Sequence, residues 1–160
     1  MAVAEAAAQA DRDLRKLTDL WQVLGDRPFK WYIADTTGEA LIRNSYFHPR
    51  NHIGEYLIEH GRRAEGRQVF EQTLSELRKL AAPGHTLGPA LYNLACVQAR
   101  EGRLEDALHS LQEGVPMRAD LAANAGADPD FALLRDNARF KALVSNVKVP
   151  SGSSGQEGKG

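Results

Sequence analysis

The N-terminal part of the chain carries one apolar stripe with helical spacing. Between residues 4 and 24, large apolar side chains recur three and four residues apart, which places them on one face of a helix. They are Leu14, Leu17, Leu20, Trp21 and Leu24. Gly25 follows directly, at a position where glycine commonly ends a helix. The pattern therefore predicts a first helix from about residue 4 to residue 24.

Residues 26–46 form a less regular segment. The segment begins with a turn, after which we expect the chain to re-enter a helix and to continue in it toward Tyr46. Two threonines and a glycine at positions 36–38 weaken this helix, so its limits are loosely defined.

Prolines and glycines divide the next stretch into two helices. Pro49 interrupts any continuous helix before it, but a proline suits the first turn of a new helix. We therefore expect a helix that starts near His48 and stops at Gly61. A further helix is predicted from about residue 63 to residue 80, where the pair Pro83-Gly84 closes it.

The second half of the chain has a clearer helix–turn–helix pattern. Residues 87–100 predict one helix, Gly102 a turn, and residues 104–114 a second helix that Pro116 stops. Short helical pieces are expected after it, at residues 117–125, 130–134 and 137–147. The stretch 149–160 is rich in glycine and serine, and we expect it to be disordered.

These elements predict an all-α fold of stacked antiparallel helix pairs, with N-terminal helices that pack on one end and short C-terminal capping helices. A chain of 160 residues suits one domain, which we place at residues 1–148. Its parts are N-terminal helices at 4–47, a first pair at 48–81, a second pair at 87–117 and capping helices at 118–148.

The stretch ALYNLACVQAREGRLEDALHSLQEG, residues 90–114, alternates large and small residues on both sides of the turn glycine Gly102. The small ones are Ala95, Ala107 and Gly114. This stretch resembles one tetratricopeptide (TPR) helix pair, a helix–turn–helix repeat of 34 residues. Gln98 departs from the pattern, because the family usually has an aromatic residue there.

An earlier stretch fits the same pattern more loosely when Gly61 is taken as the turn glycine. Gly54 and Gly66 then occupy small positions, so this stretch resembles a degenerate TPR pair. DPDFALLRDNARFKALV, residues 128–144, resembles the capping segment that often follows a last TPR. The TPR-like region thus spans about residues 50–144. An ordinary helical bundle with glycine turns is the alternative.

The TPR resemblance implies a non-enzymatic protein–protein interaction module. Stacked helix pairs form a concave groove, lined by the first helix of each pair, that holds a peptide or a partner helix. The side chains expected to face the groove are Asn93, Gln98 and Arg100 in the second pair and Asn51, Glu55 and Tyr56 in the first. Asn93 is the preferred contact, because an amide both donates to and accepts from a peptide backbone.

Residues 28–61 carry a second resemblance. In PFKWYIADTTGEALIRNSYFHPRNHIGEYLIEHG an aromatic-rich segment leads into a histidine-containing helix, and this stretch resembles the last helical part of DinB-like proteins. The resemblance implies a divalent metal ion such as zinc or nickel, with His48 and His52 as ligands on one helix face. The family takes a third histidine from an earlier helix, whereas no histidine precedes His48 here. The alternative function is therefore a DinB-like metal-binding protein or enzyme remnant.

The charges of the chain are balanced. Its 20 basic and 21 acidic residues give a formal net charge of −1, without the basic field typical of nucleic-acid-binding proteins. No apolar run approaches the ~20 residues that cross a bilayer. We therefore expect a cytoplasmic protein that binds neither nucleic acid nor membrane.

The sequence proposes no reaction. It contains no nucleophile elbow, phosphate-binding loop or dinucleotide fingerprint, which favours a binding protein without a cofactor over an enzyme. Cys96, the one cysteine of the sequence, lies in an apolar helical stretch and is expected to be a buried structural thiol.

Self-association is a third hypothesis. Two repeats are fewer than the three that a stable stack usually needs. Either the N-terminal helices or a second copy of the chain must then cover one end, with Trp21, Phe29 and Trp31 as the covering residues. The second case would make the protein a homodimer.

Overall fold

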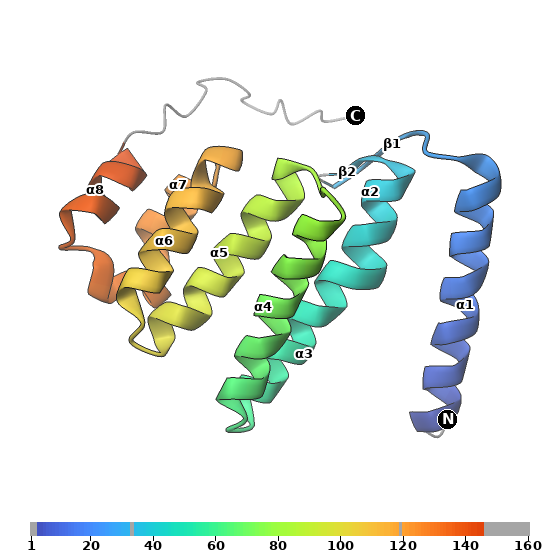
Figure 1. The fold of residues 1–160 in the computed structure, drawn as a ribbon, viewed down its shortest axis with the longest axis horizontal. Coiled ribbons are helices and arrows are strands. Elements are labelled where there is room, and N and C mark those ends of the chain that lie inside the picture. Colours follow the sequence, from blue (N-terminus) through green and yellow to red (C-terminus); the bar gives the residue numbers. More distant parts are fainter. Residues whose placement is uncertain (1–2, 33, 119, 146–160) are drawn as a thin grey trace, which may run out of the picture. The chain divides into compact units, whose positions relative to one another are not determined.

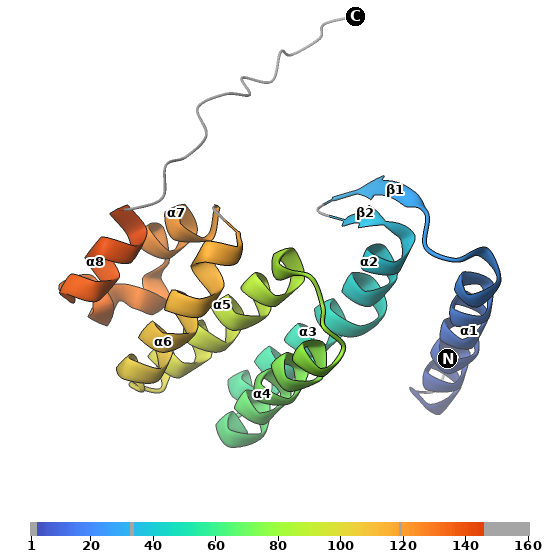
Figure 2. The same cartoon turned by 45° about the horizontal axis from the view of Figure 1, so that its top comes forward.

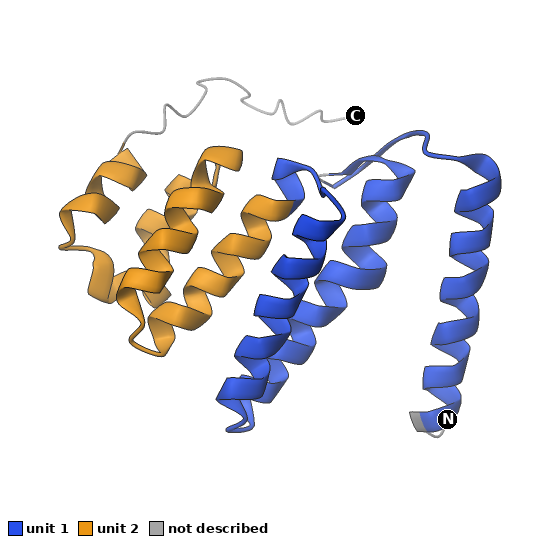
Figure 3. Ribbon diagram, in the orientation of Figure 1, with its two compact units in different colours: residues 1–86 blue, residues 87–160 orange. Residues whose placement is uncertain are grey.

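The computed structural model describes residues 3–32, 34–118 and 120–145 of the chain. Helices make up most of this part, as the all-α class predicts (Figure 1), and none of them combines the length and the apolar character needed to cross a bilayer. The chain divides into two compact units, Met1–Thr86 and Leu87–Gly160, coloured separately in Figure 3. The division falls within the segment 1–148 that the sequence predicts as one domain, and the predicted disordered stretch 149–160 lies outside the described residues.

The first unit begins with helix α1 (Val3–Leu24). The helix ends as predicted at Gly25, whose φ of +69° suits a residue without a side chain. The Gly25 N–H donates to the Trp21 carbonyl oxygen at 2.8 Å. The predicted helix over residues 4–24 is therefore confirmed, with one further residue at its start.

A two-stranded antiparallel hairpin follows, made of β1 (Pro28–Trp31) and β2 (Ala34–Thr36); Figure 2 shows it between α1 and the next helix. The predicted return to a helix directly after the turn is wrong. Aromatic side chains at Phe29 and Trp31 favour extended backbone. Tyr32 then takes a φ of +56°, a conformation that no right-handed helix contains.

Helix α2 (Thr37–Ile42) is capped by two side chains. The Thr36 hydroxyl oxygen accepts a hydrogen bond from the Glu39 N–H at 3.2 Å, and the Asp26 carboxylate accepts one from the Gly38 N–H at 2.7 Å. The bond from Gly38 is the main reason why the pKa of Asp26 lies below its usual value. Asp26 therefore ties the chain after α1 to the start of α2.

The chain stays helical from α2 through a π-helical turn, η1 (Arg43–Phe47), into α3 (His48–Glu59). Helix α3 starts at the predicted residue, but the prediction that Pro49 interrupts the helix before it is wrong. In a regular α-helix the proline ring would clash with the carbonyl group four residues earlier. In the wider π turn the His48 N–H donates to the Arg43 carbonyl oxygen five residues back, which gives the ring room.

Helices α3 and α4 (Arg63–Lys79) form a pair joined at Gly61, which has a φ of +79°. The two helices touch through glycines. A Cβ atom on Gly54 would lie 2.4 Å from the Phe70 ring, and one on Gly66 would lie 2.6 Å from the Gly54 carbonyl oxygen. The close approach of the two backbones therefore depends on the missing side chains.

A polar cluster joins η1 and α3 to α4. The Tyr46 hydroxyl donates to the Glu76 carboxylate, and the Arg50 guanidinium lies over the Tyr46 ring, 4.6 Å from its centroid. The same guanidinium is 3.6 Å from a Glu76 carboxylate oxygen. Burial first, and then the hydrogen bond to Glu76, raise the pKa of Tyr46 to about 12. Tyr46 is thus a neutral donor at neutral pH.

The second unit is built on helices α5 (Gly84–Arg100) and α6 (Leu104–Gly114), although the first three residues of α5 belong to the first unit. Helix α6 has the predicted bounds, whereas α5 starts three residues earlier than predicted. Gly102, with a φ of +76°, turns the chain between them. Gly88 and Gly114 bring the two helices together, because a Cβ atom on either would lie 3.0 Å from the carbonyl oxygen of the other.

Short helices complete the second unit. They are η2 (Val115–Met117), α7 (Asp120–Ala127), η3 (Pro129–Leu134) and α8 (Ala138–Ser145). Phe131, Leu134 and Phe140 are at most 2% exposed and belong to the same core as residues of α5, α6 and α7. The sequence therefore predicted the short helices, while the piece expected at 117–125 lies a few residues later, at Asp120–Ala127.

The contact between Gly66 and the Gly54 backbone predicts a large effect of a small substitution. In Gly66→Ala the new methyl group would meet a backbone oxygen that cannot rotate away. The free energy of unfolding should therefore fall by about 1–3 kcal/mol, as expected for an overpacked contact. Urea denaturation followed by helical circular dichroism measures this change.

Gly126→Ala in α7 is the matched control. A Cβ atom there would meet only the Val144 side chain, at 4.0 Å. This variant should equal the wild type in stability or exceed it by up to about 1 kcal/mol, because alanine favours a helix. Equal stability of the Gly66 and Gly126 variants would contradict the close contact.

Candidate functional site

Gln98 is buried between α5 and α6, whereas the sequence predicts that it faces a groove. Its side chain is 6% exposed, and its Oε1 atom accepts a hydrogen bond from the Ser110 hydroxyl at 2.9 Å, which joins α5 to α6. The prediction that Gln98 faces a groove is therefore wrong. A polar residue is tolerated at this buried position because Ser110 gives the amide oxygen a partner.

Asn93 and Arg100 remain at the surface of α5. Asn93 is half-buried and Arg100 is exposed, and their separation of about two helical turns places both on one face of the helix. Arg100 Nε lies 3.8 Å from a carboxylate oxygen of Asp130. The surface of α5 thus carries the Asn93 amide and the Arg100 guanidinium, and the contact with Asp130 partly fixes the position of the guanidinium.

Asn51, Glu55 and Tyr56 lie on α3 in the first unit. Asn51 and Glu55 are half-buried and one turn apart, while Tyr56 is 57% exposed. The Tyr56 ring stacks on His60 with the two ring centroids 3.9 Å apart, and His60 Nδ1 is 2.7 Å from the Tyr56 carbonyl oxygen. Stacking on His60 therefore fixes the position of the Tyr56 ring, which is exposed to solvent. A groove that combines these residues with those of α5 stays a prediction.

His48 and His52 lie on one face at the start of α3, as predicted. Both are exposed, and their Nε2 atoms are 3.1 Å apart. Two nitrogen ligands of a tetrahedral zinc ion, each about 2.0–2.1 Å from the metal, lie about 3.4 Å apart. The spacing therefore suits one shared ion. In the described part of the chain, no third His, Cys, Asp or Glu lies close enough to complete a set of three ligands with these two histidines.

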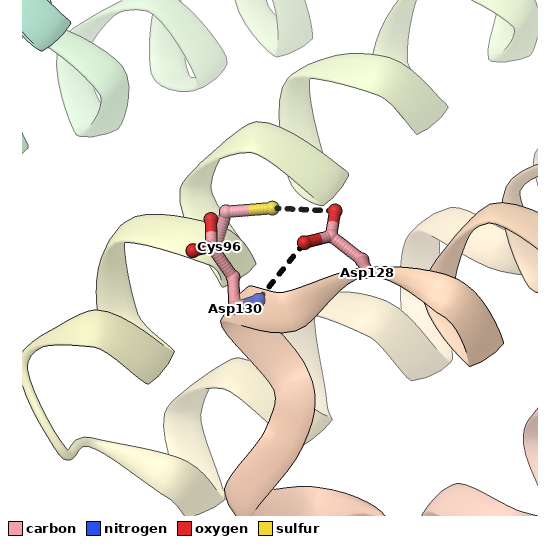
Figure 4. Close-up of side chains that lie close together, drawn as sticks. All are labelled: Cys96, Asp128 and Asp130. Atoms are coloured by element: carbon pink, nitrogen blue, oxygen red, sulfur yellow. Dashed lines mark hydrogen bonds between the residues drawn. The ribbon is translucent and has the colours of Figure 1, made fainter.

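A group of three potential ligands occurs around Cys96 in the second unit (Figure 4). The Cys96 sulfur and one carboxylate oxygen each of Asp128 and Asp130 lie within 4.8 Å of one another. Asp128 is already engaged on both oxygens. One accepts the Asp130 backbone N–H at 2.9 Å as the cap of η3, and the other accepts the Tyr92 hydroxyl at 2.8 Å and faces the Cys96 thiol at 3.9 Å.

The Cys96 thiol is protonated in this setting. Burial first, and then the charges of Asp128 and Asp130, raise its pKa well above the usual value. Nucleophilic attack uses the thiolate, and both Asp128 oxygens already accept hydrogen bonds, from the Tyr92 hydroxyl and the Asp130 N–H. The cluster therefore fits a structural joint between α5 and η3, and Cys96 is the buried thiol that the sequence predicts.

This joint does not follow from the sequence pattern. The run Asp128-Pro129-Asp130 indicates a helix start, and the cap on the Asp130 N–H follows from it. Tyr92, however, precedes Asp128 by 36 residues, and no local pattern connects them. The available signal was a tyrosine in an apolar helix, since a buried hydroxyl needs a hydrogen-bond partner.

Comparisons with known proteins do not assign the chain to a family. No family model, curated protein or solved structure matches it. The TPR-like and DinB-like resemblances therefore stay predictions, and the geometry of the chain's own residues is the basis for its proposed function.

The joint predicts that Tyr92 and Asp128 stabilise the second unit as a pair. Tyr92→Phe removes the hydroxyl that Asp128 accepts, and losing a hydrogen bond to a charged group should lower the free energy of unfolding by about 1.5–3 kcal/mol. Asp128→Asn keeps a capping oxygen for the Asp130 N–H, so the double variant should be little less stable than Tyr92→Phe alone. Urea denaturation of the four proteins measures the coupling.

Asp136→Asn is the control for this cycle. The Asp136 carboxylate is exposed and lies 3.3 Å from Lys141 Nζ, so its neutralisation should change stability by less than about 0.5 kcal/mol. Strictly additive effects of the Tyr92 and Asp128 substitutions would show that the two side chains do not act together.

Proposed function

We propose that the chain is a non-enzymatic, TPR-like interaction module that binds a peptide or a partner helix through the first helix of each pair, α3 in the first unit and α5 in the second. The polar side chains at the surface of these helices supply the contacts. The clusters inside the two units have structural roles, so the proposed function requires binding and no reaction.

The observation that carries the proposal is a shared pattern of buried positions in the two pairs. Counted from the turn glycines Gly61 and Gly102, equivalent positions are buried in both. The equivalent residues are Gly54 and Ala95, Gly66 and Ala107, Phe70 and Leu111, and Thr73 and Gly114. Proteins that repeat one helix-pair construction stack the pairs and bind extended ligands on the surface that results.

The surface residues indicate the chemistry of the ligand. Asn93 can pair with both the N–H and the carbonyl group of a peptide backbone. Arg100 attracts a carboxylate. Tyr56, stacked on His60, offers an exposed ring that an apolar side chain can cover. An acidic segment therefore suits the surface of α5 in the second unit, and an apolar side chain suits that of α3 in the first.

Removal of the α5 contacts should release such a partner. We expect a chain with Asn93→Ala and Arg100→Ala to bind its captured partner at least about tenfold more weakly than the wild type, because both side chains are surface contacts in the proposal. Mass spectrometry of proteins captured by the chain identifies the partner, and a binding titration measures the loss.

Gln68→Ala with Ser75→Ala is the matched control, since both residues are exposed on α4, the second helix of its pair. Circular dichroism checks that all variants remain folded. A partner held equally by the wild type, the α5 variant and this control would overturn the assignment of the surface.

A second candidate function is a DinB-like metal-binding protein or enzyme remnant that uses His48 and His52. The observation in its favour is the 3.1 Å distance between their Nε2 atoms. Imidazole nitrogens suit zinc and nickel, and water would occupy the other coordination positions. Two protein ligands predict a modest affinity.

The metal hypothesis predicts that the chain binds zinc or nickel and that His52→Ala weakens this binding by about tenfold or more, because one of two ligands is lost. Isothermal titration with each metal ion measures the affinity. His109→Ala is the control, because His109 is an exposed histidine on α6. If His52→Ala and His109→Ala bind the metal equally, His48 and His52 do not form the site.

A further inference from the structure

Helix α1 leaves a continuous apolar stripe open to solvent. Its large side chains are between 38% and 53% exposed, and they are Leu14, Leu17, Leu20, Trp21 and Leu24. A surface helix of a globular domain normally buries such a stripe against neighbouring elements. Here every residue from Ala4 to Leu24 is exposed, so the stripe lacks a cover.

The C-terminal part of the stripe forms one wall of an open groove. Phe29 and Leu41 line the groove from the hairpin and from α2, and its volume is about 320 Å³. The Trp21 indole lies beside Gly38 at the start of α2, because a Cβ atom on that glycine would be 3.3 Å from Trp21 Nε1. The groove is therefore apolar and largely preformed, and it lies wholly within the first unit.

The stability of α1 requires that the stripe be covered. Most helical stability in proteins comes from burial of an apolar face rather than from the intrinsic preference of the residues, so the 22 residues of α1 gain most when their stripe is covered. The groove against the hairpin and α2 involves only the last two turns or so of α1. The preceding turns need a further partner.

The stripe has the spacing of a coiled-coil seam. Intervals of three and four residues alternate through Ala7, Ala10, Leu14, Leu17, Trp21 and Leu24. Its N-terminal positions are small and its C-terminal positions are large. A surface that matches the stripe must therefore have large side chains opposite its small ones and small side chains opposite its large ones.

We propose that a second copy of the chain covers the stripe, with the two α1 helices antiparallel. The facing pairs would be Ala7 with Leu24, Ala10 with Trp21, and Leu14 with Leu17. In this register Trp21 and Leu24 each meet an alanine of the second copy, and Leu14 meets Leu17. A parallel register would overfill the seam where Trp21 faces Trp21 and leave a void where Ala7 faces Ala7.

The charges beside the seam are compatible with this pairing. Asp11 pairs with Arg15 at 3.0 Å, and Asp13 pairs with Lys16 at 3.5 Å, within the same helix. Both edges are thus close to neutral, and a net charge of −1 adds little repulsion between two chains. Antiparallel helices also place the positive end of one helix dipole beside the negative end of the other.

The oligomeric state tests the proposal. Sedimentation equilibrium of the wild-type chain should give the mass of a dimer at chain concentrations within about 1–100 µM. Leu17→Glu places one carboxylate from each chain in the seam and should raise the dissociation constant about 100-fold or more. Val23→Glu is the matched control, because Val23 is 83% exposed and lies off the seam, and it should leave the dissociation constant within about threefold of the wild type.

Disulfide trapping tests the orientation without changing the middle of the seam. A mixture of Ala7→Cys and Leu24→Cys chains should form a cross-linked dimer on oxidation, whereas each variant alone should not, because like positions of antiparallel helices lie about 25 Å apart. Cys96 is buried and does not compete. A wild-type monomer at about 100 µM would overturn the proposal and leave the stripe to a different protein. Cross-linking of either variant with itself would overturn the antiparallel arrangement.

Discussion

Contact between helix backbones at glycine positions sets the spacing of both helix pairs, and the rest of the structure depends on it. In the first pair the helices meet where Gly66 lies against the Gly54 carbonyl group, and in the second where Gly88 lies against Gly114. With the backbones this close, the interface has no room for one added methyl group. The large side chains must therefore pack beside the glycines, which fixes which residues stay at the surface of α3 and α5.

The parts of the fold that the sequence predicted well are those determined by local chemistry. The ends of α1, α3 and α5 depend on glycines with a left-handed backbone, at Gly25, Gly61 and Gly102, and such positions can be recognised without any knowledge of the tertiary fold. The bounds of α6 follow from Gly102 before it and Pro116 after it, which are also local signals.

The parts that could not be predicted depend on contacts between distant residues or on unusual backbone geometry. The hairpin after α1 is too short for a strand pattern, and the helix continues through Pro49 only because a π turn precedes it. In the candidate site, Asn93 and Arg100 were placed at the surface from spacing alone. The burial of Gln98 and the bond between Tyr92 and Asp128 depend on partners in other helices, which periodicity does not identify.

Polar groups inside the two units join helices to one another. Ser110 holds Gln98, Asp128 holds Tyr92, and Glu76 holds Tyr46, in each case between different elements. A buried polar pair contributes to the uniqueness of packing because an alternative arrangement would leave both partners unsatisfied. The polar groups available to a ligand are therefore those at the surfaces of the helices.

The placement of Cys96 has a practical consequence for following the two units. Both tryptophans of the sequence, Trp21 and Trp31, lie in the first unit, whereas the single cysteine is buried in the second. Tryptophan fluorescence therefore follows the first unit, and the rate of thiol labelling follows the opening of the second. The natural sequence thus carries one spectroscopic reporter and one chemical reporter, and the local stability of each unit can be measured in the same sample without a label.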